Sequence, residues 1–221
     1  MSPNTLSPIE HLRKIEDRKV KVNRKHHRRP LSVAEVRQLL DAARKAPDRY
    51  GMTGLERALL YQLAVETGLR ASELRSLTRS SFQLEGDEPT VTVAGAYTKS
   101  NEAAVIPLRI ETATALRESL RGKVPAVKAF SVPPSTMTAA MLRADLEDAG
   151  ISCCVDGKFA DFHALRHTCG TWLAAAGTHP KVIQRVMRHS TITLTMDRYT
   201  RLFKGDEAAA VASLPTSVHQ S

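Results

Sequence analysis

Six polar side chains, each in a distinctive local sequence, are candidates for binding and breaking a phosphodiester. In chain order they are Arg70, Lys99, His163, Arg166, His189 and Tyr199. Cationic groups and imidazoles can bind the oxygens of a phosphate, and a phenol can act as a nucleophile. Tyr199 follows His189 by ten residues and is the only tyrosine after Tyr97. The set therefore indicates a site that binds a phosphodiester and attacks it with a phenol.

The two arginines occupy places from which helices would present them. Gly68 predicts the end of one helix, and another is expected to begin just after Arg70. The Arg70 cation would then lie at a helix N-terminus, where free backbone N–H groups also favour an anion. His163 and Arg166 are three residues apart and would share one helix face, so that both can donate to a single phosphate.

Three local sequences in this order resemble the catalytic domain of the tyrosine recombinase (phage integrase) family. They are T-G-L-R-A-S-E-L at residues 67–74, H-A-L-R-H-T at residues 163–168, and R-H-S at residues 188–190 followed by Tyr199. Each one alone is a weak signal, and the combination is specific. The resemblance covers roughly residues 31–203. The family also has a lysine in a β-hairpin between the first two boxes, and Lys99 is the only lysine between Arg70 and Arg121.

The resemblance implies that the arginines and histidines act on the phosphate. Arg70 and Arg166 would offset the charge that the non-bridging oxygens gain in the transition state. His163 and His189 would add hydrogen bonds, and one of them would help accept a proton. Glu73 would be a buried partner that orients an arginine.

The resemblance also implies a covalent reaction without metal, ATP or cofactor. Tyr199 would form a 3′-phosphotyrosine ester, and Lys99 would protonate the leaving 5′-oxygen. An ordinary tyrosine has a pKa near 10, so attack at neutral pH requires removal of its proton. Taken singly, an arginine is more often a surface ion-pair partner and a tyrosine more often a core residue.

The reaction implied is site-specific recombination or integration of double-stranded DNA. The partners expected are further copies of the chain in a tetrameric synapse, or an intact recombinase. Two alternatives stay open: a type IB topoisomerase, and a truncated DNA-binding remnant without turnover. The sequence departs from the family at Arg188, where glycine is usual, and in the His189-to-Tyr199 spacing, where nine is common. Only about thirty residues precede the catalytic domain, in place of a core-binding domain.

Charge is concentrated at the start of the chain. The net charge is +9 with a pI near 9.7, which favours a polyanionic partner. Residues 1–30 hold nine basic and three acidic side chains. We interpret them as a basic arm that lies along the DNA backbone, with a solvated tail as the alternative. The DNA contacts expected in this arm are Arg24, Lys25, Arg28 and Arg29.

Composition limits the compartment and the ligands. No apolar run approaches the ~20 residues of a membrane span, and the N-terminus lacks the apolar segment of a signal peptide. We therefore expect a cytoplasmic, DNA-associated protein. The three cysteines, Cys153, Cys154 and Cys169, lack metal-site spacing and are interpreted as reduced and structural.

Periodicity predicts a mainly α fold with a small antiparallel β-sheet. Ser32 with Glu35, and Thr53 with Glu56, have capping-box spacing and predict two helix starts. Residues 153–159 could form a hairpin or a loop. Helices are expected over about 32–46, 53–68, 71–78, 110–121, 136–149, 162–176 and 180–187, and strands over 82–84, 90–93 and 103–108. The domains predicted are the arm over 1–30, the catalytic domain over 31–203 and a tail over 204–221.

Overall fold

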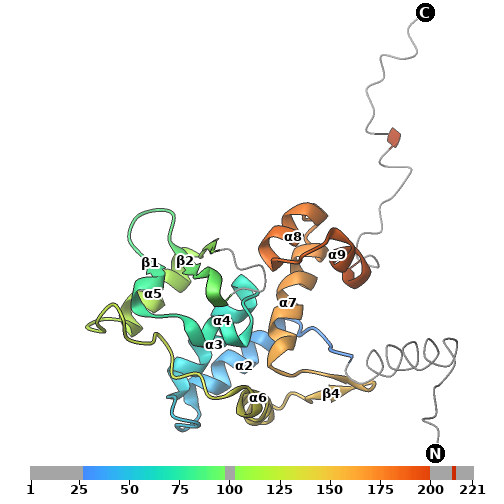
Figure 1. Ribbon diagram of the computed structural model, residues 1–221. Coiled ribbons are helices and arrows are strands. Elements are labelled where there is room, and N and C mark those ends of the chain that lie inside the picture. The colour runs from blue at the N-terminus through green and yellow to red at the C-terminus, as the bar shows by residue number, and fades with distance from the viewer. Residues whose placement is uncertain (1–26, 98–102, 200–210, 213–221) are drawn as a thin grey trace, which may run out of the picture.

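The computed structural model describes residues 27–97, 103–199 and 211–212 of the 221-residue chain (Figure 1). Most of the secondary structure is helical, as the sequence predicts. The helices are α2 (Val33–Lys45), α3 (Gly54–Thr67), α4 (Ala71–Ser76), α5 (Ile110–Ser119), α6 (Ser135–Asp148), α7 (Phe162–Ala175), α8 (Pro180–Met187) and α9 (Ile192–Tyr199), with short 3-10 turns at Arg79–Ser81 and Gly95–Tyr97.

Helices α2 and α3 begin where the capping pattern predicts. Ser32 Oγ accepts the backbone N–H of Glu35, whose carboxylate accepts the N–H of Ser32 in return. Thr53 and Glu56 repeat this exchange at the start of α3. Each exchange satisfies two N–H groups that would otherwise lack partners at a helix start. The starts of these two helices are therefore fixed by local sequence.

The three-stranded sheet is antiparallel, in the order β1 (Phe82–Gln83), β2 (Thr90–Val93) and β3 (Ala104–Pro107). In β2, Val91 and Val93 are buried while Thr92 is exposed, so alternation places one face on the core. The expected turn with Lys99 between β2 and β3 lies outside the described residues.

Residues 153–159 form a hairpin, which decides between the two alternatives. β4 (Cys154–Val155) pairs with β5 (Lys158–Phe159). Asp156 and Gly157 connect the strands, and both have positive φ (51° and 70°). Two positive φ values are typical of the tight turn that matches strand twist.

The core surrounds α3, which is buried along almost its whole length. It packs against α2, α5 and α7, and an ion-pair network ties it to α6. In this network Arg57 Nε donates to Asp145 Oδ2 at 2.8 Å, and the Tyr61 hydroxyl donates to the same oxygen at 2.6 Å. All three side chains are fully buried. The network anchors the helix whose C-terminal end leads to Arg70.

A smaller apolar cluster is formed by side chains of α7, α8 and α9. In Figure 1, α7 joins α8 and α9 to the main body of the molecule. Its buried members are Cys169, Ala174, Ile183, Met187 and Tyr199. Within the described part of the chain, no helix is both long and apolar enough to cross a membrane.

Candidate active site

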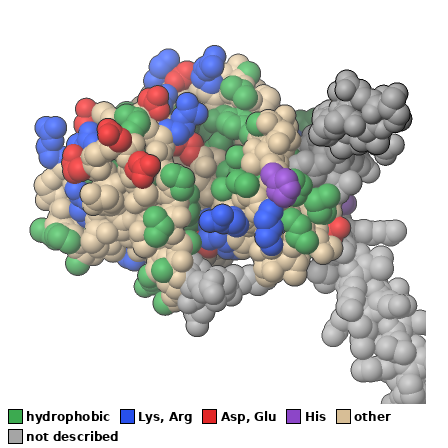
Figure 2. Space-filling view, turned by 90° about the horizontal axis from the view of Figure 1, so that it is seen from above, with side chains coloured by type: hydrophobic (Ala, Val, Ile, Leu, Met, Phe, Trp, Pro, Cys, Tyr) green, Lys and Arg blue, Asp and Glu red, His purple; other side chains and the backbone are tan. Residues whose placement is uncertain are grey.

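Five of the six residues singled out by sequence line one pocket of about 250 Å³. It lies where the start of α4, the face of α7 and the α8–α9 segment meet. Lys99 lies outside the described residues. On the face drawn in Figure 2, basic side chains and a histidine lie together to the right of centre, whereas basic and acidic side chains are mixed on the left. The pocket is lined by Arg70, His163, Arg166, His167, Met187, His189, Leu194, Arg198 and Tyr199.

Arg70 is presented by the break between α3 and α4. Gly68 ends α3 with φ 61°, a left-handed conformation that glycine adopts without strain. Arg70 then serves as the N-cap residue of α4. The fully buried carboxylate of Glu73 accepts the Arg70 backbone N–H at 2.7 Å and Arg70 Nη1 at 2.8 Å. Glu73 therefore holds both the backbone and the guanidinium of Arg70.

Glu73 is ionised in this arrangement. Burial alone would raise its pKa, but Arg188, the Arg70 N–H and the Arg70 guanidinium outweigh burial and lower the pKa below its usual value. Arg188 Nη2 donates to Glu73 Oε2 at 2.8 Å. One buried carboxylate is thus shared by two arginines.

Arg166 lies on α7 and is almost fully buried. Its two terminal nitrogens donate to the backbone carbonyls of Gly68 and Met187, which fixes the plane of the guanidinium. Burial, with Arg70 and Arg188 nearby, lowers its pKa to about 9. Arg166 therefore remains a cation at neutral pH, and its two hydrogen-bond partners are neutral backbone carbonyls.

Both histidines are neutral at pH 7. Burial, followed by the neighbouring Arg28 and Arg166, lowers the pKa of His163 to about 4. Burial, followed by Arg166 and Arg198, lowers the pKa of His189 to about 4. His189 Nδ1 lies 2.9 Å from Thr195 Oγ1 on α9, so this hydroxyl orients the ring. A neutral imidazole can donate one hydrogen bond and accept another.

Tyr199 ends α9 and is only 1% exposed. Its ring packs on α7 at Gly170: a Cβ at that position would meet the hydroxyl oxygen, Cζ and Cε2, the last at 2.9 Å. The His167 ring centroid lies 5.9 Å from that of Tyr199. Burial raises the pKa of Tyr199 to about 12, with Arg198 and Arg166 opposing the rise. The phenol is therefore protonated at neutral pH.

The structure pairs the two described arginines of the basic arm with acidic side chains. Arg28 Nε donates to Asp161 at 2.8 Å, and Arg29 Nη1 donates to Glu35 at 2.8 Å. The backbone N–H of Arg29 donates to the Phe159 carbonyl, which seats this segment beside β5. Arg24 and Lys25, the other two expected DNA contacts, lie outside the described residues.

Some features of the site were not assigned a role from sequence. Arg188 was noted as a departure from the family pattern, and its contact with Glu73 spans 115 positions of sequence. Gly170 had a detectable signal, because an isolated glycine within a helical pattern often marks a close approach of another group. Arg198 lines the pocket one residue before Tyr199.

The described residues bring together two arginines, two neutral imidazoles and a phenol. Such a set can bind a phosphate dianion or diester, accept a proton and supply an oxygen nucleophile. Within the described ranges, no group of three or more His, Cys, Asp or Glu residues is arranged to hold a metal ion. Cys169 is buried and unpaired, with a pKa that burial raises to about 11.

Comparison with known families gives a match over most of the chain. The family described as Phage integrase family matches residues 29–205. Among curated proteins, the chain is 27% identical to the tyrosine recombinase XerA of Saccharolobus solfataricus over 186 residues, which are 84% of this chain and 56% of that protein. It is 28% identical to the tyrosine recombinase XerC of Myxococcus xanthus over 183 residues, 78% of this chain and 57% of that protein. The chain thus spans somewhat more than half the length of these relatives.

Solved structures share the fold. The XerH site-specific recombinase in a pre-cleavage complex with its difH substrate superposes with a TM-score of 0.66 at 18% identity, over 86% of this chain and 55% of that one. The catalytic domain of bacteriophage HP1 integrase superposes with a TM-score of 0.61 at 22% identity, over 88% of this chain and 100% of that one. At these identities the likeness concerns the fold.

Proposed function

Because the chain belongs to the phage integrase family, we propose that it contains the catalytic domain of a tyrosine-type site-specific DNA recombinase. The proposed domain covers residues 31–203, preceded by the basic arm over 1–30 and followed by a tail over 204–221. The observation that carries the proposal is the meeting of Arg70, Arg166, the two histidines and Tyr199 at one pocket. Similarity to XerA and XerC supports it.

In the proposed reaction the pocket binds the scissile phosphate between Arg70 and Arg166. Arg166 is fixed by two backbone carbonyls, and Glu73 fixes Arg70. Charged donors held in place before the reaction stabilise the transition-state charge without reorganising. Neutral His163 and His189 would donate to the same oxygens without competing as cations.

Bond exchange would follow an in-line displacement. The Tyr199 oxygen forms a bond to phosphorus while the bond from phosphorus to the 5′-oxygen breaks. The phenolic proton passes to a neutral imidazole, because a tyrosine with a pKa near 12 does not ionise unaided at pH 7. Lys99 would donate a proton to the leaving 5′-oxygen. One phosphodiester is exchanged for a phosphotyrosine ester, so rejoining needs no ATP.

The proposed partner is double-stranded DNA, with copies of the chain assembling as a tetramer on two duplexes or joining an intact recombinase. The XerH structures that share the fold of this chain are complexes with a difH substrate. The net charge of +9 supports a polyanionic partner. Such a protein would act in the cytoplasm, at the nucleoid.

Covalent trapping tests this proposal. A bound site is first selected from a random-sequence duplex pool and then placed in a suicide substrate with a nick beside the scissile phosphate. Wild type and Tyr199→Phe are incubated with this substrate, and adducts are separated on a denaturing gel. Tyr199→Phe keeps the ring that packs on Gly170 and removes only the nucleophilic oxygen.

An adduct formed by wild type and not by Tyr199→Phe is the expected result. If the folded wild type binds the selected duplex and forms no adduct, the proposed enzyme activity is contradicted and a DNA-binding remnant is favoured. Relaxation of a supercoiled plasmid without strand exchange between two duplexes would favour a type IB topoisomerase.

A further inference from the structure

Arg188 adopts a backbone conformation that usually belongs to glycine. It follows α8 with φ 49° and ψ 46°, in the left-handed region that side chains with a Cβ disfavour. An arginine at such a position adds backbone strain to the native state. Residues held in such conformations cluster at functional sites, where surrounding contacts maintain them.

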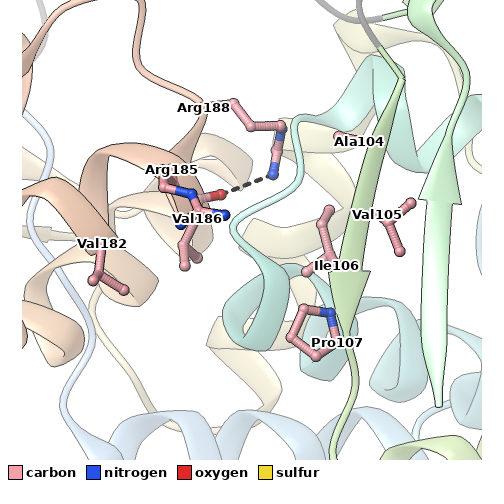
Figure 3. A pocket seen from close by; sticks show the side chains of 8 residues that line it. All are labelled: Ala104, Val105, Ile106, Pro107, Val182, Arg185, Val186 and Arg188. Carbon is pink, nitrogen blue, oxygen red and sulfur yellow. Dashed lines mark hydrogen bonds between the residues drawn. The ribbon is translucent and has the colours of Figure 1, made fainter. Parts of the chain in front are cut away.

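The Arg188 side chain turns inward and is 12% exposed. Nη1 donates to the Val186 carbonyl at 2.9 Å, a contact drawn in Figure 3, where Arg188 lies at the top of the pocket between α8 and β3. Nη2 donates to Glu73 Oε2 at 2.8 Å and lies 3.3 Å from the Gly68 carbonyl oxygen. Glu73 holds Arg70, and the Gly68 carbonyl holds Arg166. Arg188 thus contacts the groups that fix both phosphate-binding arginines.

The two oxygens of Glu73 are divided between the arginines. Oε1 accepts Arg70 Nη1 at 2.8 Å, while Oε2 accepts Arg188 Nη2 and the backbone N–H of Arg70. An arginine beside a free carboxylate normally forms a forked pair that uses two of its nitrogens. Here Oε2, the oxygen that such a pair would also need, already accepts Arg188 Nη2 and the backbone N–H of Arg70. Within the described residues, the Arg70 guanidinium makes no hydrogen bond other than the one from Nη1.

We propose that Arg188 is a positioning residue that keeps Arg70 from closing a forked pair on Glu73 and so leaves the remaining Arg70 N–H groups for the phosphodiester. The inference rests on the proposed function, because it concerns the same phosphate site. Its direction is specific: loss of Arg188 weakens phosphate engagement by Arg70 while Glu73 stays paired and buried.

Two other roles predict different behaviour. If Arg188 only neutralised Glu73 to stabilise the fold, its removal would lower thermal stability and leave the folded protein fully active. If Arg188 acted only as a distant positive charge, its removal would weaken phosphate binding equally whatever residue stands at position 70. The positioning role requires an arginine at position 70, because only a forked side chain can form the competing pair with Glu73.

The test measures single-turnover adduct formation on the suicide substrate for Arg188→Met and Arg188→Lys, each with Arg70 and with Arg70→Lys. Met keeps the unbranched stem of the side chain as far as the place of Nε and removes its charge and donors, whereas Lys can still donate to Oε2. With Arg70 present, Arg188→Met should slow adduct formation about tenfold, the worth of roughly one charge-assisted hydrogen bond, and Arg188→Lys should recover most of it. In the Arg70→Lys background, Arg188→Met should change the rate less than about twofold. An equal loss in both backgrounds, or no loss with Arg70, would overturn the proposal.

A measurement without turnover separates this inference from the proposed function. If wild type forms no adduct, the proposed function fails, and inorganic phosphate binding is then titrated by NMR on the Arg70 Nε–H signal. Phosphate affinity should be about tenfold weaker in Arg188→Met than in wild type. Unchanged affinity, with wild type binding phosphate, would refute the positioning role on its own.

Discussion

Tyr199, the candidate nucleophile, packs on α7 at Gly170. Replacing Gly170 with alanine should lower the free energy of unfolding when Tyr199 is present and raise it when the tyrosine ring is removed. A Cβ at position 170 would lie 2.9 Å from Tyr199 Cε2 and nearer still to Cζ and the hydroxyl oxygen. Ordinary contacts begin near 3.4 Å. The tyrosine ring, which is buried in the small cluster formed by α7, α8 and α9, would therefore have to shift.

Two opposing terms decide the magnitude. Forcing a methyl group into a packed site costs about 1–3 kcal/mol. Replacing a helix-interior glycine with alanine stabilises a helix by about 0.5–1 kcal/mol. Gly170→Ala should therefore lower the free energy of unfolding by up to about 2.5 kcal/mol in the presence of Tyr199.

The variant Tyr199→Ala separates the effect of the tyrosine ring from the effect on the helix. In Tyr199→Ala the obstructing atoms are gone, so Gly170→Ala should raise the free energy of unfolding by about 0.5–1 kcal/mol. Urea unfolding of the four proteins, followed by the fluorescence of the single tryptophan Trp172 on α7, measures both changes. Gly170→Ala should also slow adduct formation, because the nucleophile is displaced.

Equal destabilisation of both backgrounds by Gly170→Ala would contradict this prediction. Such a result would mean that Gly170 is required by something other than the tyrosine ring. Stabilisation in the Tyr199 background would mean that the ring does not occupy this position in solution.

Three further predictions concern the phosphate site, its pH dependence and the arm. Arg70→Ala leaves Glu73 paired with Arg188 and should cut adduct formation about a hundredfold or more, and Arg166→Lys should have the same effect. Both variants should lose much less duplex affinity in a gel-shift assay. Equal losses in adduct formation and in duplex affinity would contradict the role of the two arginines. Burial holds the pKa of His163 and His189 at about 4, so the unfolded chain takes up protons first as pH falls. Stability that is present above pH 6.5 should be lost towards pH 4, by at most about 2 kcal/mol per histidine at pH 5. Replacing both by Asn should reduce the loss of urea-unfolding stability between pH 7 and pH 5, while His167, whose pKa burial also lowers, keeps part of it. Residues 1–26 hold seven basic and three acidic side chains, so their deletion should reduce the slope of log affinity for DNA against log salt concentration. An unchanged slope would favour the alternative interpretation of these residues as a solvated tail.

The sequence by itself determined the features that depend on neighbouring residues. Capping pairs such as Ser32 with Glu35 fix helix starts, because both hydrogen bonds close within four residues. Gly68 predicted the end of α3 and the presentation of Arg70. The types and order of the candidate catalytic residues were read from three local sequences that resemble the phage integrase family, and their cations, imidazoles and phenol suit a phosphodiester.

Only the tertiary structure decided which distant groups share a partner. Glu73 and Arg188 are 115 positions apart, and their contact depends on how α8 packs beside the turn after α3. Arg29 belongs to a basic run in sequence, yet the fold pairs it with Glu35 and the Ser152 carbonyl. Local patterns carry periodicity and charge, whereas the partner of a buried charge is set by the packing of whole helices, which no short stretch of sequence contains.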